Sequence, residues 1–300
     1  MNQKDGPGPV IVGLGEILWD VFPDGPRFGG APANFACSAA GLTDKASVRM
    51  VSAVGDDELG RLACGEFARR GVGTSAVKVS ELPTGTVDVS LDDAGKAKYR
   101  FAENVAWDDL TWSKHLEELA RLTDAVCFGT LGQRSDVSRQ TIQRFVSDTP
   151  TAAIRVFDIN LRPPFYTNDI IKDSLQICNC LKLNDEELPL VAELSNAEEA
   201  TGQGQLQRIA ECWDLRSVVV TRGANGAALW HRGDYCEVPG VPTDVKDTVG
   251  AGDSFTAALT IGLLQQMDPQ QVCTWACRVA AFVCSRSGAT PAIPSELRLV

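Results

Sequence analysis

The sequence predicts an α/β protein with a doubly wound, mostly parallel β-sheet that is flanked by helices on both faces. Two observations predict this class: short apolar runs recur along the chain, and helical segments separate them. A chain that alternates strands and helices in this way packs helices on both sides of a parallel sheet. Because the chain has 300 residues, we expect one domain over residues 1–300 with a small appendage.

The alternation begins at the N-terminal end. We predict strands over residues 10–14 and 48–54, and helices over 32–40 and 57–70. The first helix has Pro32 at its start, where the missing N–H costs nothing. The second helix has an acidic first turn and a basic last turn, which complement the helix dipole.

A segment of different texture follows. Residues 85–91 alternate and are rich in Val and Thr, residues 92–95 (Asp-Asp-Ala-Gly) carry a turn signal, and 96–101 resume as a strand. This pattern predicts a β-hairpin. We expect segments 16–31 and 84–107 to form a lid over a cleft. Exposed strand edges favour pairing with another chain, so the lid is also a candidate surface for a homodimer.

The alternation resumes after the lid and continues to the C-terminus. Strands are predicted at residues 125–128, 153–157, 180–183 and 218–221, with helical segments between them. Two long helices, at 253–267 and 269–285, follow and are each apolar on one face.

The composition excludes several classes of partner. The net charge is −11, and an acidic surface disfavours nucleic acid and anionic membranes. No run of eighteen apolar residues predicts a transmembrane helix. Residues 1–9 form a polar lead-in without the basic start and apolar run of a signal peptide. The ten cysteines are scattered, so we expect reduced thiols in a cytoplasmic protein.

The segment 247–255, Asp-Thr-Val-Gly-Ala-Gly-Asp-Ser-Phe, carries the clearest chemistry. Its glycines permit close approach of the backbone to a ligand, and a helix start offers unpaired N–H groups and a positive dipole end. Gly250, Ala251 and Gly252 can therefore form an anion hole for a phosphoryl group. Asp253 at its mouth can take a proton from an attacking hydroxyl. From spacing alone, a simple helix N-cap at Asp253 is an equal alternative.

Three segments together resemble the ribokinase-type, or PfkB, carbohydrate kinase family over nearly the whole chain. They are Gly29-Gly30-Ala31-Pro32-Ala33-Asn34, preceded by Gly15-Glu16 and Asp20; Asp158-Ile159-Asn160-Leu161-Arg162-Pro163, followed by Asn184-Asp185-Glu186-Glu187; and residues 247–253. Each segment is a weak signal alone, and their shared order and spacing make a strong one. The resemblance implies a ribokinase-like fold and transfer of the γ-phosphoryl group of ATP to a sugar hydroxyl.

The resemblance also implies roles for individual residues. It makes Asp253 the catalytic base and Gly250, Ala251 and Gly252 its anion hole. The resemblance implies that the sugar contacts Asp20, Gly29, Gly30, Asn34, Phe101 and Arg162. The chemistry of Asp20 and Asn34 agrees with this, because carboxylates and amides are good partners for hydroxyls. The plain structural alternatives are a solvated acid at Asp20, a helix cap at Asn34 and a surface salt bridge at Arg162.

The same resemblance places the nucleotide and its ions in the C-terminal half. Asn184 and Glu187 resemble the N-x-x-E pair that organises Mg²⁺, water and phosphate, and Mg²⁺ prefers few protein oxygens. Asp247 and Val249 lie where many members of the family bind K⁺. The residues expected to contact ATP are Asn184, Thr221, Gly223, Gly226, Ala281, Cys284 and Gly288.

The choice of substrate follows from the resemblance as well. Residues 29–34 and 19–23 are most similar to the fructokinase branch, so fructose is the first expectation; ribose, 2-keto-3-deoxygluconate and nucleosides are alternatives. A catalytically inactive nucleotide- or sugar-binding paralogue is another. A dinucleotide-dependent oxidoreductase is disfavoured because Leu18 replaces the third glycine of a G-x-G-x-x-G motif, and no Walker-type P-loop is present. His115 and His231 lie in no motif.

Overall fold

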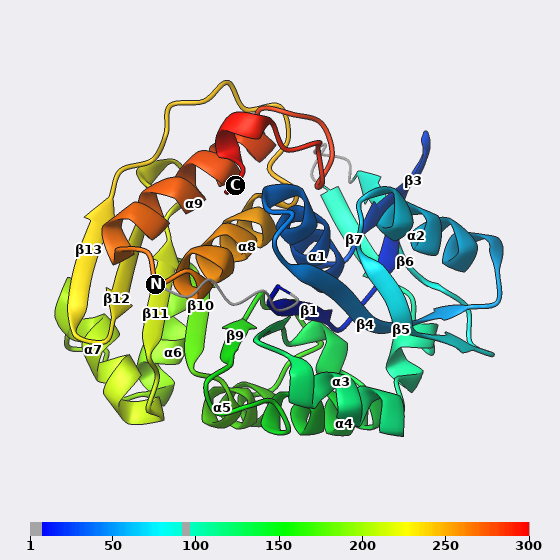
Figure 1. The fold of residues 1–300 in the computed structure, drawn as a ribbon, viewed down its shortest axis with the longest axis horizontal. Coiled ribbons are helices and arrows are strands. Elements are labelled where there is room, and N and C mark those ends of the chain that lie inside the picture. Colours follow the sequence, from blue (N-terminus) through cyan, green and yellow to red (C-terminus); the bar gives the residue numbers. More distant parts are fainter. Residues whose placement is uncertain (1–7, 92–96, 300) are drawn as a thin grey trace.

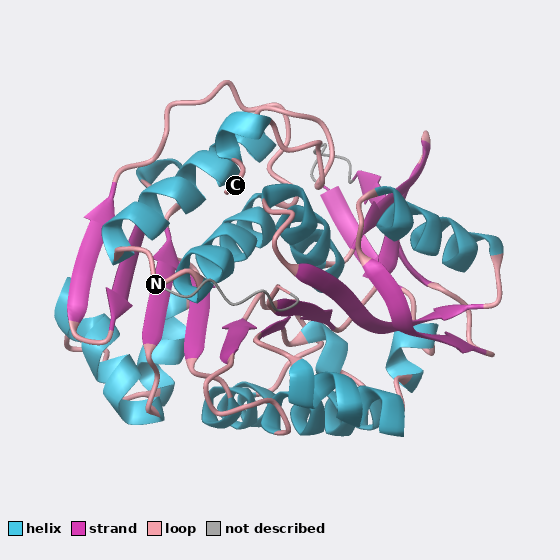
Figure 2. Cartoon of the chain, in the orientation of Figure 1, coloured by secondary structure: helices cyan, strands magenta, loops and turns pink. Residues whose placement is uncertain are grey.

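The computed structural model describes residues 8–91 and 97–299, and a large β-sheet forms its centre (Figures 1 and 2). The spatial order of the strands is β13-β12-β11-β10-β9-β8-β1-β4-β5. They are β1 (Val10–Leu14), β4 (Ser47–Gly55), β5 (Gly73–Ser80), β8 (Ala125–Phe128), β9 (Ile154–Asp158), β10 (Cys180–Asn184), β11 (Ser217–Thr221), β12 (Ala227–His231) and β13 (Asp234–Val238). The pairings from β11 to β5 are parallel, and β11–β12 and β12–β13 are antiparallel. The prediction of a mostly parallel sheet is confirmed.

The strand order reverses between β1 and β8, which are parallel neighbours. From β1 the chain moves outward to β4 and β5, and it then returns to begin β8 on the other side of β1. The loops that follow the two strands diverge at such a point, and a crevice opens at the carboxyl ends of the strands. This topology predicts where a ligand binds.

Helices cover both faces of the sheet, which confirms the doubly wound class (Figure 1). One face carries α1 (Ala31–Leu42), α2 (Glu58–Arg69), α8 (Ala251–Leu264) and α9 (Pro269–Cys284), and the other carries α3 (Lys114–Leu122), α4 (Asp136–Ser147), α5 (Asn168–Ile177), α6 (Leu188–Leu194) and α7 (Gly202–Trp213). Successive side chains of a strand point to opposite faces. Ile11 therefore enters the core under α1 and α8, whereas Val12 enters the core on the other face.

No helix among residues 8–91 and 97–299 is long and apolar enough to cross a membrane. All ten cysteines lie within these residues and are free thiols, most of them buried or partly buried. This state of the cysteines agrees with the prediction of unpaired, mostly buried thiols.

A four-stranded sheet stands beside the large one, where the sequence predicted only a hairpin. In the spatial order β3-β2-β6-β7, its strands are β2 (Leu18–Phe22), β3 (Gly25–Gly29), β6 (Gly85–Leu91) and β7 (Ala97–Phe101). β2 pairs with β6 in parallel, and each outer strand pairs antiparallel with its neighbour. Leu18, Val87 and Trp107 pack with Leu131, which follows β8, in a small apolar cluster. The predicted turn at 92–95 and the first seven residues of the predicted lead-in lie outside the described residues.

The structure also corrects the start of the predicted helix 253–267. Helix α8 begins at Ala251, because Gly250 adopts a left-handed conformation (φ 78°) and is the N-cap residue. Asp253 therefore lies inside the first helical turn, and the alternative that Asp253 is a simple N-cap is wrong.

Candidate active site

The candidate active site lies at the carboxyl ends of β1, β8 and β9, where the strand order reverses. A cavity of about 10 Å³ lies there, a volume that holds about one water molecule. Its polar lining residues are Glu16, Thr130, Asp158, Asn160 and Asp253. This space is far too small for a ligand of more than a few atoms, so it can form only part of a ligand site.

Asp253 faces the start of α1 from the first turn of α8. Its Oδ2 accepts a hydrogen bond of 2.8 Å from Nδ2 of the buried Asn34, which lies 219 positions earlier in the chain. Burial and then the charge of Asp158 raise the pKa of Asp253 to about 7, while Asn34, Lys182 and Arg162 oppose the rise. A carboxyl group with this pKa can accept and release a proton near neutral pH.

The glycine turn before Asp253 is held in a conformation that other residues resist. Gly250 has a φ of 78°, and a Cβ on it would lie 2.4 Å from the carbonyl oxygen of Ala289. Asp247 braces the turn, because its carboxylate accepts the N–H of Val249 at 3.0 Å and the N–H of Gly288 at 2.9 Å. The turn leads into the N-terminus of α8, where backbone N–H groups and the helix dipole favour a bound anion.

The Gly29–Gly30 turn joins β3 to α1, close to Asn34, which is the hydrogen-bond partner of Asp253. Gly30 is the N-cap of α1 with a φ of 108°, and a Cβ on it would lie 2.6 Å from the carbonyl oxygen of Glu16. A Cβ on Gly29 would lie 3.0 Å from Oδ2 of Asp20. The carbonyl of Gly30 accepts the N–H of Asn34 at 2.8 Å. Both glycines therefore allow a close approach that a side chain would block.

Glu16 is a member of the site to which the sequence analysis assigned no role. It lies two residues after the end of β1, and only 3 % of its surface is exposed. Its Oε1 accepts the N–H of Ala31 at 3.2 Å, and its Oε2 has no hydrogen-bond partner within the described part of the chain. Burial raises the pKa of Glu16 to about 7. An acidic residue placed shortly after a buried strand was the available sequence signal.

Arg162 and Phe101 are the remaining residues that the resemblance assigned to the substrate, and neither lines the cavity. Phe101, at the end of β7, packs edge-to-face on Phe165 with ring centroids 5.3 Å apart. Arg162 is exposed. Burial raises the pKa of three carboxyl groups of the site, and the positive charge of Arg162 lowers it. These are Glu16, Asp20 and Asp253. Arg162 therefore acts on the carboxyl groups of the site and is more than a distant surface charge.

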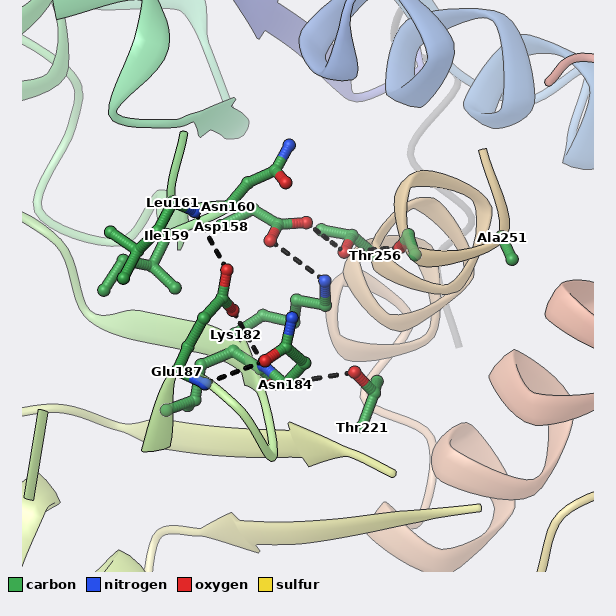
Figure 3. Close-up of polar contacts among 12 residues, drawn as sticks. Asp158, Ile159, Asn160, Leu161, Lys182, Asn184, Glu187, Thr221, Ala251 and Thr256 are labelled. Atoms are coloured by element: carbon green, nitrogen blue, oxygen red, sulfur yellow. Dashed lines mark hydrogen bonds and ion pairs between the residues drawn. The ribbon is translucent and has the colours of Figure 1, made fainter. Parts of the chain in front are cut away.

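Asn184 and Glu187 hold each other at the end of β10 (Figure 3). The N–H of Asn184 donates to Oε2 of Glu187 at 2.9 Å, and the N–H of Glu187 donates to Oδ1 of Asn184 at 2.8 Å. Oε1 of Glu187 accepts the N–H of Leu161 at 2.9 Å. Since backbone amides already occupy both carboxylate oxygens, the pair suits contact with Mg²⁺ through a water. In the described ranges, no group of three His, Cys, Asp or Glu side chains is arranged to hold a metal.

A buried ion pair that the sequence analysis missed lies between Glu187 and α8 (Figure 3). Nζ of Lys182 is 3.0 Å from Oδ1 of Asp158, and the two side chains are 8 % and 6 % exposed. The hydroxyl of Thr256, in α8, is 2.8 Å from Oδ2 of Asp158. A lysine in the apolar strand Cys-Leu-Lys-Leu was the signal for this pair, because a buried charge needs a partner.

The residues expected to contact ATP fall in two places. Thr221, at the end of β11, lies beside Asn184 in the register of β10 and β11. It is followed by Gly223 and Gly226, which have φ values of 53° and 90°. An open hollow of about 350 Å³ lies between residues 241–244 and α9.

Ala281 lines this hollow, whereas Cys284 and Gly288 do not. The carbonyl of Cys284 instead accepts the N–H of Asp247 at 3.2 Å, and the N–H of Gly288 donates to the Asp247 carboxylate. Cys284 and Gly288 therefore hold the segment that leads into the glycine turn.

Both histidines lie away from the cavity. Nδ1 of His231 is 2.7 Å from the hydroxyl of Ser217 across β11 and β12, and burial lowers its pKa. His115 lies in α3, and neither histidine lines the cavity. The absence of a motif around the histidines therefore agrees with their positions.

Known proteins resemble this chain along nearly its full length. Residues 25–296 match the family model described as "pfkB family carbohydrate kinase". A fructokinase of Escherichia coli is 26% identical over 95% of this chain and 96% of its own, and "Probable fructokinase-3" of Arabidopsis thaliana is 26% identical over 99% and 92%. A fructokinase structure from Xylella fastidiosa with bound ATP matches with a TM-score of 0.81 at 25% identity, covering 96% of each chain. With this match over most of its length and this fold, the chain belongs to the pfkB family of carbohydrate kinases and is a sugar kinase.

Proposed function

We propose that this sugar kinase is an ATP-dependent fructokinase in which Asp253 is the catalytic base. The proposal is carried by the setting of Asp253, whose carboxyl group has a pKa of about 7, accepts a hydrogen bond from Asn34 and lies in the first turn of α8. A proton acceptor beside an anion-binding helix start suits transfer of a phosphoryl group to a hydroxyl. The relatives named fructokinase support fructose as the acceptor.

In the proposed reaction, the sugar lies above the cavity with its hydroxyls on Asp20, Asn34 and the backbone at Gly30. Asp253 accepts the proton of the attacking hydroxyl, and the hydroxyl oxygen forms a bond to the γ-phosphorus. The bond from this phosphorus to the bridging oxygen breaks, and that oxygen leaves with ADP. The turn at 250–252 stabilises the charge on the transferring phosphoryl oxygens.

ATP lies along the carboxyl ends of β10 and β11 in this proposal. Thr221, Gly223 and Gly226 lie beside its phosphates, and the hollow beside α9 receives the adenine. Asn184 and Glu187 would hold water around a phosphate-bound Mg²⁺, and that ion supplies charge neutralisation when it is bound. A K⁺ ion near residues 247–249 is a further part of the proposal.

The small sheet is proposed to be a lid within a single domain. Segments 16–31 and 84–107 contain β2, β3, β6 and β7, and their closure over the sugar would exclude water as a competing acceptor. The outer strands β3 and β7 present edges that can pair with a second copy of the chain.

One observation favours a second acceptor. The exposed guanidinium of Arg162 acts on the carboxyl groups of the site, and a guanidinium forms strong, directional hydrogen bonds with a carboxylate. An acidic sugar such as 2-keto-3-deoxygluconate would use this group, whereas fructose, ribose and nucleosides would not need it.

The test is release of ADP from ATP and Mg²⁺ with fructose, 2-keto-3-deoxygluconate, ribose, glucose and adenosine, each with and without K⁺. Turnover with fructose alone supports the proposal, and turnover with another sugar keeps the mechanism and changes the substrate. If the protein binds ATP but phosphorylates none of them, an inactive sugar- or nucleotide-binding paralogue replaces the proposal.

A further inference from the structure

The ion pair of Lys182 and Asp158 lies beside α8 (Figure 3). The two residues are register neighbours in β10 and β9, and Nζ of Lys182 is 3.0 Å from Oδ1 of Asp158. A Cβ on Gly252 would lie only 3.2 Å from the same Nζ. The ammonium group therefore lies against the first turn of α8. A buried ion pair contributes little net stability, so its place beside this turn points to a role other than stability.

The second oxygen of Asp158 connects the pair to α8. The hydroxyl of Thr256 is 2.8 Å from Oδ2 of Asp158 and 2.9 Å from the carbonyl oxygen of Gly252, with one hydrogen to donate between them. Thr256 lies three residues after Asp253 and thus on the same side of the helix. Asp158 can therefore fix the turn that carries the base, but its negative charge also repels Asp253.

We propose that Lys182 and Asp158 act as one positioning pair, in which Asp158 fixes the first turn of α8 through Thr256 and Lys182 counteracts part of the negative charge that Asp158 imposes on Asp253. The inference rests on the proposed role of Asp253 as the base. The positive charge of Lys182 also interacts with the nearby carboxyl groups of Glu187 and Asp253.

The effects on Asp253 have the signs that this role requires. The charge of Asp158 raises the pKa of Asp253, and the charge of Lys182 lowers it. Other charged or titratable groups reach Asp253 from neighbouring elements: Glu16 after β1, Cys127 in β8 and Arg162 after β9. Burial raises the pKa of the Cys127 thiol, which keeps it neutral. Lys182 and Asp158 are the members of this group that are bonded to each other, so they can be altered together.

The test compares Lys182→Met, Asp158→Asn, the double variant and Thr256→Val with the wild type. The apparent pKa of Asp253 is read in two ways: from the acid limb of kcat against pH, and from ¹³C NMR of labelled aspartate side chains, with Asp253→Asn to assign the signal. The NMR measurement requires no turnover, so it separates this inference from failure of the proposed function.

We expect Lys182→Met to raise the apparent pKa of Asp253 by about one unit, which lowers kcat about tenfold at each pH below the limb. Asp158→Asn should lower the pKa, and the double variant should return it close to the wild-type value. Thr256→Val should reduce kcat without moving the pKa, because it loosens the turn and changes no charge.

Loss of activity in Lys182→Met with an unmoved pKa of Asp253 would overturn the inference, because a merely structural pair predicts that result. If Lys182→Met does not fold, the test rests on Asp158→Asn and the double variant, since neutral replacements of both partners are often tolerated. A pKa that stays unchanged in Asp158→Asn refutes the inference equally.

Discussion

Replacing Asp253 by Asn should abolish most turnover and, at the same time, stabilise the folded chain at neutral pH. The substitution keeps an oxygen that can accept the 2.8 Å hydrogen bond from Asn34, but it removes the charge. General-base catalysis contributes about 10²- to 10⁴-fold, so kcat should fall by at least about 10² while ATP binding stays nearly normal.

The expected gain in stability follows from the pKa of Asp253, which is about 7 in the folded chain against an ordinary value of 3.8. Between these pH values, the folded chain holds a proton that the unfolded chain has lost. The wild type therefore loses stability as pH rises through this window, by about 1.4 kcal/mol per pH unit. From pH 5 to pH 7 the loss is at most about 3 kcal/mol, because Asp253 keeps some contact with solvent.

The assay is urea unfolding of the wild type and Asp253→Asn at pH 5 and pH 8, without ligands. The quantity compared is the free energy of unfolding of the variant minus that of the wild type. This difference should be larger at pH 8 than at pH 5 by up to about 3 kcal/mol. Asp56→Asn is the matched control, since that side chain is 85% exposed, and it should show no such change. A difference that is the same at both pH values would refute the assignment of a raised pKa to Asp253.

Three further predictions follow from the same geometry. Wild-type kcat should fall about tenfold per unit below pH 7 as Asp253 becomes protonated; a flat profile from pH 5 to 8 would exclude this residue as the base. Asn34→Ala removes a donor that lowers the pKa of Asp253, so the acid limb should move to higher pH and the sugar KM should rise; an unmoved limb contradicts this. In Gly250→Ala, the new Cβ would lie 2.4 Å from the carbonyl oxygen of Ala289. This substitution should lower the free energy of unfolding, measured in urea, by about 1–3 kcal/mol. The loss should clearly exceed that of Gly71→Ala, a position where φ is also positive but a Cβ would meet no atom within 4 Å. Equal costs would show that the contact with Ala289 does not matter.

The central strands were predictable because they are apolar along their whole length. Residues 10–14 and 125–128 were predicted as strands, and the structure has strands β1 and β8 there. Strand β5 and the hairpin of β12 and β13 lie at the edges of the sheet. The sequence did not predict these strands. In β5 and β13, partly exposed residues interrupt the apolar pattern, so the sequence signal resembles that of a loop.

The strands of the small sheet were harder to predict for a related reason. Both β2 and β3 are short, and β3 begins with Gly25 and Pro26, which are typical of turns. The second partner of β2 is β6, which begins at Gly85, far along the chain. Pairing across this distance depends on tertiary packing, which outweighs local preference.

Within the candidate site, a contact between residues close in sequence was easier to predict than one between strands. Asn184 and Glu187 are three positions apart, and the structure places them in reciprocal contact. The pair of Lys182 and Asp158 was missed because it depends on the register between two strands. The carbonyl of Cys284 accepts the N–H of Asp247, a backbone role that no motif reveals.

The contact between Asn34 and Asp253 has a consequence for how activity arises during synthesis. Its two partners are separated by 219 positions, and α8 must pack against α1 before they can meet. A ribosome-bound chain that has not yet produced α8 contains Asn34 but lacks Asp253, the proposed base. Contacts of such long range form late and slowly. Appearance of kinase activity therefore reports that the two ends of the chain have come together, and during refolding it should lag behind the recovery of helical signal.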